Sequence, residues 1–208
     1  MNKDALKLYL VTDRGLCGGR DLCEIVRAAA AGGVTMVQLR EKDIDTRTFV
    51  EEALALKGVL APLGIPLIIN DRVDVVLATD ADGVHIGQSD MPYETARRLL
   101  GPEKIIGLSV ENMQQVVQAN SFDVDYIGVS PVFATPTKTD TAAPFGIEGL
   151  REAVTLSRHP AVGIGGMNSS TAAQVFAAGA AGIAVVSAIM ADDNPGEASR
   201  RLMEIIEE

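Results

Sequence analysis

The sequence predicts an α/β protein that folds as a single (β/α)8 TIM barrel covering residues 1–208. Eight short apolar segments alternate with helical segments at intervals of roughly 25 residues, as in repeated βα units. Most of the apolar segments are continuous runs, which is typical of parallel strands covered by helices. The 208 residues, of which 47% are hydrophobic, suffice for one sizeable core.

Each expected strand is an apolar, β-prone run that stops at a polar residue or a glycine. The first run, LKLYLV, stops at Thr12, and the last run, GIAVV, stops at Ser187. The eight expected strands cover residues 6–11, 35–39, 66–69, 83–86, 104–108, 126–129, 161–164 and 182–186.

The segments between these strands carry helix signals. Asp21 is expected to cap the first helix, which ends at Gly32-Gly33. The second helix starts at Asp45 or Thr46, and its expected buried face comprises Phe49, Val50, Ala53, Leu54, Lys57 and Leu60. Further helices are expected after residue 72, over 92–100, over 111–119, after Gly149, after a cap at Asn168 or Ser169, and over 197–206.

A doubly wound open sheet is the alternative fold. Its dinucleotide-binding form carries GxGxxG after the first strand, whereas this chain has LCGGRD there. A weak internal repeat also favours the barrel, because AAAAGGVTMVQL and FAAGAAGIAVVS both read as helix, glycine turn and strand.

Charge and segment length limit the classes of partner. A net charge of −10 opposes binding to nucleic acid or to anionic membrane surfaces. The apolar segments, about 4 to 8 residues each, are too short to span a bilayer, and MNKD does not resemble the start of a signal peptide. We therefore expect a cytoplasmic protein with small-molecule partners, and leave open whether it forms a homo-oligomer. Cys17 and Cys23 are expected to be free thiols.

Candidate site residues follow from one rule: catalytic groups of such barrels lie at the carboxyl ends of the strands. Asp71 and Asp90, together with nearby cations, suit a Mg²⁺ ion shared with a diphosphate. The backbone N–H groups after the last two strands suit a phosphate. The residues selected in this way are Gln38, Arg40, Lys42, Asn70, Asp71, Asp90, Ser109, Thr135, Thr137, Lys138, Gly165, Gly166, Val186 and Ser187.

Each of these residues also has a structural interpretation. Asn70 or Asp71 would cap the following helix, and Asp90 would stand in a turn. The charged residues at 40–42 would form a solvated run. His85, which lies within an apolar strand, is interpreted as a packed core residue. The convergence of two carboxylates and three cations on one rim favours the functional interpretation.

The segment after the sixth strand is long and rich in proline and threonine, with no period of its own. Loops of this length inside a compact domain are usually functional or disordered, and the prolines lower the entropy of ordering the segment. We therefore expect a ligand-binding loop in which Thr135, Thr137 and Lys138 contact phosphate oxygens; a solvated surface loop is the alternative.

Six motifs in this order resemble those of the thiamine-phosphate synthase family. They are QLREK at 38–42, NDR at 70–72, DGVHIGQSDMP at 82–92, TPTKTD at 135–140, GIGGMN at 163–168 and GIAVVSAI at 182–189. The resemblance spans Leu8 to about Ile189. One departure is Ser130, where the family often has glycine.

The resemblance implies a Mg²⁺-dependent transferase of thiamine biosynthesis. It would join 4-amino-2-methyl-5-(diphosphomethyl)pyrimidine to a thiazole phosphate and release pyrophosphate, by way of a pyrimidine cation. Asp71 and Asp90 would hold Mg²⁺, and Arg40, Lys42, Ser109 and Lys138 would be catalytic. The implied substrate-binding residues are Gln38, Leu39, Arg40, Glu41, Lys42, Asn70, Ser109, Thr135, Pro136, Thr137, Lys138, Gly166, Val186 and Ser187. A thiazole tautomerase-like relative and a non-catalytic barrel that binds a phosphorylated metabolite are the alternatives.

Overall fold

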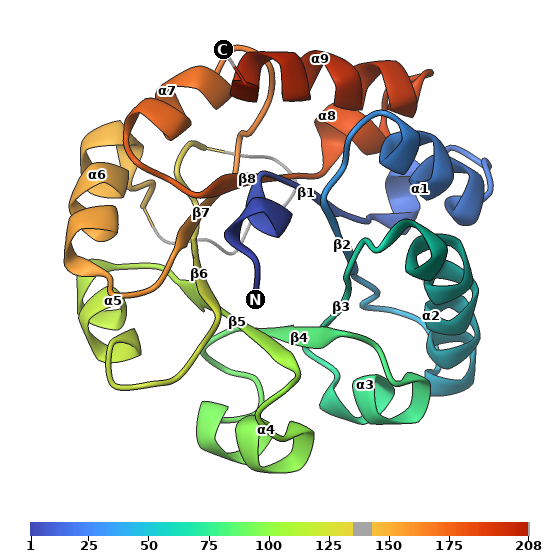
Figure 1. The fold of residues 1–208 in the computed structure, drawn as a ribbon, viewed down its shortest axis with the longest axis horizontal. Coiled ribbons are helices and arrows are strands. Elements are labelled where there is room, and N and C mark those ends of the chain that lie inside the picture. Colours follow the sequence, from blue (N-terminus) through green and yellow to red (C-terminus); the bar gives the residue numbers. More distant parts are fainter. Residues whose placement is uncertain (135–142, 208) are drawn as a thin grey trace.

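The computed structural model describes residues 1–134 and 143–207, and its strands form one closed parallel barrel (Figure 1). Strands that are consecutive in the chain are neighbours, and β8 pairs with β1 to close the ring. The strands are β1 (Leu8–Val11), β2 (Met36–Leu39), β3 (Leu67–Asn70), β4 (Gly83–Ile86), β5 (Ile105–Val110), β6 (Tyr126–Val129), β7 (Ala161–Ile164) and β8 (Gly182–Val185). The predicted barrel is therefore confirmed.

The strand boundaries differ from the prediction at places that matter for the site. β4, β6 and β7 have the predicted bounds, whereas β3 extends to Asn70 and β5 extends to Val110. β1 starts two residues later than predicted, because the chain before it forms a 3-10 helix, η1 (Lys3–Leu6).

Helices surround the barrel (Figure 1). They are α1 (Leu22–Ala31), α2 (Thr46–Leu60), α3 (Val73–Thr79), α4 (Tyr93–Leu100), α5 (Met113–Ala119), α6 (Gly146–Leu156), α7 (Ala172–Ala177), α8 (Ser187–Met190) and α9 (Pro195–Glu207), with 3-10 turns η2 (Arg14–Leu16) and η3 (Ala61–Leu63). The Asp21 and Asp45 side chains cap α1 and α2, as predicted. The prediction for Leu54 is wrong: it is 50% exposed, because it lies about 140° around α2 from the buried Phe49.

Alternate residues of each strand face the inside and the outside of the barrel. The outward side chains pack under the helices in the larger apolar cluster. The inward side chains form a smaller cluster of Leu6, Tyr9, Val11, Met36, Ile68, Tyr126, Val162 and Ala184. Leu6 belongs to η1, which precedes β1 and lies over the centre of the ring in Figure 1. Apolar packing therefore fills the amino end of the barrel, and polar inward residues gather at the carboxyl end.

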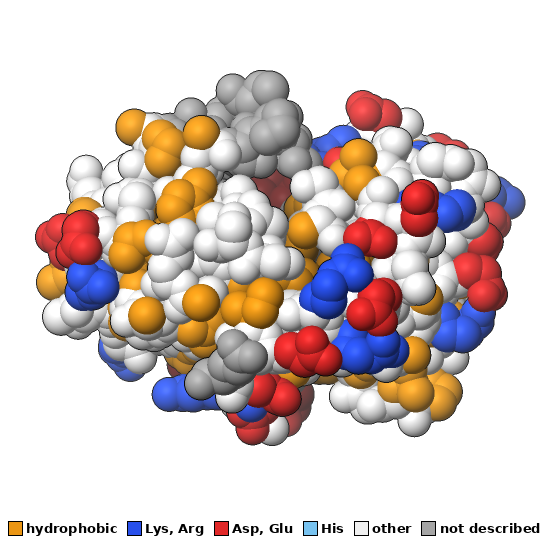
Figure 2. All heavy atoms as spheres, turned by 90° about the horizontal axis from the view of Figure 1, so that it is seen from above, with side chains coloured by type: hydrophobic (Ala, Val, Ile, Leu, Met, Phe, Trp, Pro, Cys, Tyr) orange, Lys and Arg blue, Asp and Glu red, His pale blue; other side chains and the backbone are white. Residues whose placement is uncertain are grey.

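On the face shown in Figure 2, basic side chains lie beside acidic ones and do not form a continuous basic surface. Within the described residues, every helix is too short or too polar to cross a membrane.

Candidate active site

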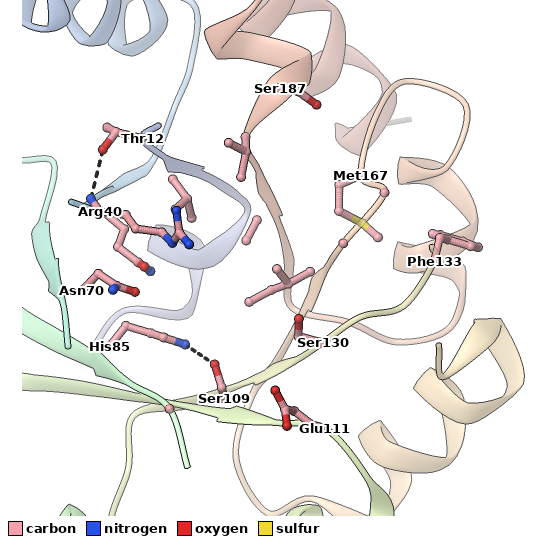
Figure 3. A pocket seen from close by; sticks show the side chains of 18 of the residues that line it. Thr12, Arg40, Asn70, His85, Ser109, Glu111, Ser130, Phe133, Met167 and Ser187 are labelled. Carbon is pink, nitrogen blue, oxygen red and sulfur yellow. Dashed lines mark hydrogen bonds between the residues drawn. The ribbon is translucent and has the colours of Figure 1, made fainter. Parts of the chain in front are cut away.

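A cavity of about 650 Å³ lies at the carboxyl ends of the strands. Each of the eight strands contributes to its lining, either within the strand or directly after it. Eleven of the predicted site residues line it: Gln38, Arg40, Lys42, Asn70, Asp71, Asp90, Ser109, Gly165, Gly166, Val186 and Ser187. Figure 3 shows the Arg40 and Asn70 side chains across the cavity from Met167 and Phe133.

Strand alternation separates the residues of the QLREK motif. Gln38, Arg40 and Lys42 line the cavity, whereas Leu39 is fully buried in the cluster under the helices. Because side chains alternate along an extended chain, the neighbours of three inward residues must point outward. Leu39 and Glu41, both predicted to bind substrate, accordingly lie outside the lining of this cavity.

Glu41 instead makes an ion pair behind the rim. Its side chain is only 3% exposed, and its Oε2 accepts a hydrogen bond of 3.1 Å from Nε of Arg14, which also pairs with Glu52. Burial raises the pKa of Glu41, and Arg14 opposes this shift. Glu41 is therefore placed to hold β2 against the chain around Arg14.

The Glu41→Gln variant is expected to keep activity close to that of the wild type. Its free energy of unfolding should change less with pH than that of the wild type, because the variant lacks the ionisable carboxyl group. The pKa of Glu41 is higher in the folded state than its ordinary value of 4.5. Protonated Glu41 therefore stabilises the fold at pH values below 4.5, and this stabilisation is lost as the pH rises through the pKa of the folded state. Chemical denaturation across this pH range measures the change, with the exposed Glu51→Gln as control. A large loss of activity in Glu41→Gln would instead support substrate binding.

On one side of the cavity, a buried amide group has no hydrogen-bond partner among the described residues. Asn70 is 7% exposed, and its Nδ2 finds no acceptor within the described part of the chain. Buried donors are almost always satisfied, so this amide is suited to a ligand oxygen. Arg40, whose backbone N–H donates to Thr12 Oγ1 over 3.0 Å (Figure 3), places a guanidinium in the same cavity.

The two predicted metal ligands lie beside each other. Burial raises the pKa of Asp90, and the adjacent Asp71 carboxylate raises it further; a hydrogen bond of 2.7 Å from the Gly87 N–H opposes the shift. Asp71 also accepts a hydrogen bond of 2.5 Å from Lys42 Nζ. Like charges held together at a cavity wall are suited to a cation between them.

Asp71 reaches this position through an unusual backbone conformation. Its φ of 62° lies in the left-handed region, which Asp and Asn tolerate better than most residues. This turn breaks the alternation after β3, so the consecutive residues Asn70 and Asp71 both line the cavity.

The opposite side of the cavity contains the glycine turn after β7. Gly166 has a φ of 69°, and a Cβ atom there would lie 2.7 Å from the Phe133 Cβ, so only glycine is accommodated. The expectation that Asn168 or Ser169 caps the next helix is wrong, because α7 begins at Ala172 after a separate turn. Ser187, in contrast, is the first residue of α8.

The lining residues that were not predicted as site residues include His85, Glu111 and Ser130. His85 is buried as expected, yet its Nε2 forms a hydrogen bond of 2.8 Å with Ser109 Oγ (Figure 3). Glu111 was assigned to a helix, but β5 ends at Val110 and Glu111 follows it. If β5 had been predicted to end at Val110, the rule that site residues follow the carboxyl ends of the strands would have selected Glu111. The Ser130 side chain occupies space that a glycine would leave open.

Four predicted residues, Thr135, Pro136, Thr137 and Lys138, lie outside the described residues, and their roles stay predictions. The residues directly before them, Phe133 and Ala134, line the cavity.

Known proteins resemble this chain over almost its whole length. A family model described as thiamine monophosphate synthase matches residues 8–189. A thiamine-phosphate synthase of Albidiferax ferrireducens is 57% identical, over 98% of this chain and 93% of the relative, and one of Vibrio campbellii is 53% identical, over 96% and 98%. A solved thiamine phosphate pyrophosphorylase from Pyrococcus furiosus superposes with a TM-score of 0.91 at 39% identity, covering 99% of this chain and 97% of that one. Because the family model covers most of the chain and the relatives are more than 50% identical over nearly all of it, the chain belongs to the thiamine monophosphate synthase family.

Proposed function

We propose that the protein is a Mg²⁺-dependent transferase that joins 4-amino-2-methyl-5-(diphosphomethyl)pyrimidine to a thiazole phosphate, forming thiamine phosphate and pyrophosphate. The observation that supports these substrates best is the adjacent carboxylate pair Asp71 and Asp90 in a cavity that also holds Arg40 and Lys42. Carboxylates alone would repel a diphosphate, and cations alone would not require two adjacent carboxylates. Together they suit a metal–diphosphate complex.

The donor set suits Mg²⁺, which takes one or two carboxylates and completes its coordination with water and phosphate oxygens. Among the described residues there is no cluster of three or more His, Cys, Asp or Glu side chains arranged for a metal, so the pair Asp71 and Asp90 would hold the ion together with substrate. When bound, Mg²⁺ would neutralise negative charge on the diphosphate.

The chain's own residues would divide the ligands between the two sides of the cavity. Arg40, Lys42 and the unmet Nδ2 of Asn70 would bind the diphosphate, together with the predicted contacts of Lys138. Gly166, Val186 and Ser187 would bind the thiazole phosphate, together with Thr135 and Thr137. Gln38 and Ser109, deeper along their strands, would contact the pyrimidine ring.

The reaction needs one bond to break and one to form. The C–O bond between the pyrimidine methylene and the diphosphate breaks, and the electron pair leaves with pyrophosphate. The amino-substituted ring carries the resulting positive charge until the thiazole nitrogen forms the new C–N bond. Fixed cations that stabilise the growing charge on the leaving group would therefore supply the catalysis. The thiazole nitrogen is already nucleophilic, so the reaction requires no activated serine or cysteine.

Release of pyrophosphate tests this proposal directly. Purified protein with both substrates and Mg²⁺ should release pyrophosphate and form thiamine phosphate in equal amounts, and omitting either substrate or adding a chelator should abolish both products. A protein that releases no pyrophosphate under these conditions would contradict the proposal.

The two alternatives predict other outcomes in the same assay. A tautomerase-like relative would convert a thiazole phosphate carboxylate without the pyrimidine and would have no use for the carboxylate pair. A non-catalytic barrel would bind the phosphorylated compounds, as calorimetry would show, without turnover. The adjacent Asp71 and Asp90 favour the synthase over both.

A further inference from the structure

A continuous chain of hydrogen bonds crosses the barrel interior between two residues that line the cavity. Gln38 Nε2 donates to Tyr9 OH over 2.7 Å, and Tyr9 OH lies 2.8 Å from Tyr126 OH. Tyr126 OH lies 2.9 Å from His85 Nδ1, and His85 Nε2 lies 2.8 Å from Ser109 Oγ. The five residues come from five strands, β2, β1, β6, β4 and β5.

The interior of this chain is shielded from water. Tyr9 and Tyr126 are fully buried and His85 is 5% exposed. Burial raises the pKa of both phenols, so each keeps its proton at neutral pH. The T-shaped contact between the two tyrosine rings, 5.8 Å between centroids, fixes their relative orientation.

A glycine on β5 makes room for this arrangement. A Cβ atom on Gly107 would lie 2.3 Å from Tyr126 OH and 2.6 Å from His85 Nδ1. Gly107 pairs with Tyr126 on one side and with His85 on the other in the strand register. The barrel is therefore built to bring the phenol and the imidazole together at this level.

With His85 as a neutral imidazole, proton counting allows two ordered states for this chain. Each tyrosine has one O–H, and a neutral imidazole has one N–H. If Tyr9 donates to Tyr126, then Tyr126 must donate to His85 Nδ1, and His85 must donate from Nε2 to Ser109. The other state reverses every bond. Any mixed order leaves a buried O–H without an acceptor in the chain, two lone pairs facing each other, or two protons between one pair of atoms, and each of these is costly.

We propose that Tyr9, Tyr126 and His85 are positioning residues that set the hydrogen-bonding character of Gln38 and Ser109 in concert. In the order that begins with Gln38 Nε2 donating to Tyr9, the Gln38 Oε1 remains available to accept from a ligand. In the same order the Ser109 Oγ accepts from His85 Nε2, so the Ser109 O–H remains available to donate to a ligand. In the reversed order the two ends exchange roles, so one end always accepts while the other donates.

A ligand edge with one donor and one acceptor matches this pair of ends. This step rests on the proposed function, which places an aminopyrimidine in the cavity: its exocyclic amino group donates and its ring nitrogen accepts. The amino group would bind Gln38 Oε1, and the ring nitrogen would accept from Ser109. The buried chain would thus hold both contacts in the order that the ring requires, before the ring arrives.

Tyr126→Phe tests the chain because it removes the central hydroxyl and keeps the ring. We expect kcat/KM for the pyrimidine diphosphate to fall roughly 10- to 100-fold, the loss that follows from unmet buried hydrogen-bonding groups, while the KM for the thiazole phosphate stays unchanged. Tyr93→Phe is the matched control: Tyr93, the first residue of α4, lies outside the cavity lining, and its hydroxyl accepts an exposed hydrogen bond from the Asp123 N–H. It should behave as wild type.

A double-variant cycle separates positioning from general destabilisation. If Tyr126 acts through Ser109, its substitution should cost much less in a Ser109→Ala protein than in the wild type. Equal costs in both backgrounds, or wild-type kinetics for Tyr126→Phe, would overturn the proposal.

A second measurement does not depend on any variant of Tyr126 or on substrate. Nitrogen-15 NMR of the wild-type protein reports which ring nitrogen of His85 carries the proton, and His159→Gln assigns the signals because the chain has only two histidines. We expect the proton on Nε2. A proton on Nδ1 would overturn the proposed order. If the wild type forms no thiamine phosphate, the proposed function fails, but this measurement still decides the order of the chain.

Discussion

Replacing either Asp71 or Asp90 by asparagine is expected to lower kcat/KM by about 100- to 1,000-fold, the usual effect of losing one group that stabilises charge in a transition state. Each substitution removes half of the carboxylate pair that would hold Mg²⁺ beside the diphosphate. Excess Mg²⁺ should restore part of the activity, because the remaining carboxylate still binds the ion more weakly. Pyrophosphate release measured over a Mg²⁺ titration gives both quantities.

Both variants are expected to fold normally. Asparagine tolerates the left-handed backbone of residue 71, and an amide oxygen at residue 90 still accepts from the Gly87 N–H. Each substitution also removes the repulsion that raises the pKa of Asp90. Without Mg²⁺, their free energies of unfolding should therefore lie close to that of the wild type.

Asp74→Asn is a suitable control for these variants. Asp74 belongs to the same part of the chain and pairs with Arg72 over 2.6 Å, but lies outside the cavity lining. It should keep full activity. Wild-type turnover of both Asp71→Asn and Asp90→Asn at limiting Mg²⁺ would remove the metal assignment.

Lys42→Ala and Ser187→Ala are expected to weaken different substrates. Loss of the Lys42 charge should raise the KM for the pyrimidine diphosphate by roughly 10- to 100-fold, as for other hydrogen bonds to charged groups, and should leave the KM for the thiazole phosphate nearly unchanged. Ser187→Ala should show the opposite preference with a smaller effect, because a hydroxyl is lost and the backbone N–H at the start of α8 remains. Equal effects on both substrates would show that the two sides are misassigned.

Two features make this comparison sharper than a substitution at Gly166. Any side chain at Gly166 is strained and meets Phe133, so lost activity there would not report on phosphate binding. Lys42 also bonds Asp71, so Lys42→Ala frees a carboxylate for the ion and extra Mg²⁺ should not rescue it. The absence of rescue by Mg²⁺ would distinguish Lys42→Ala from the Asp71→Asn and Asp90→Asn variants. Lys7→Ala is the control, because Lys7 precedes β1 and its side chain pairs with Asp4.

The fold and much of the rim were predictable because their signals are local. An apolar run, its length and the polar residue that ends it are all properties of a few neighbouring residues. Alternation would also have separated Leu39 and Glu41 from Gln38, Arg40 and Lys42, had it been applied to the whole motif. The boundary errors at Asn70 and Ser109 arise because pairing with neighbouring strands, such as Ser109 with Gly128, decides where a strand ends.

The sequence by itself determined the barrel and the set of polar residues at its carboxyl end, since a repeated βα pattern has one closed solution and places all strand ends on one rim. Only the tertiary structure decided which of these residues meet. Asp71 lies beside Asp90, Glu41 pairs with Arg14, and Tyr9 contacts Tyr126 from 117 residues away. Such contacts depend on strand register and on space left by residues such as Gly107, which come from distant parts of the chain and leave no local pattern in the sequence.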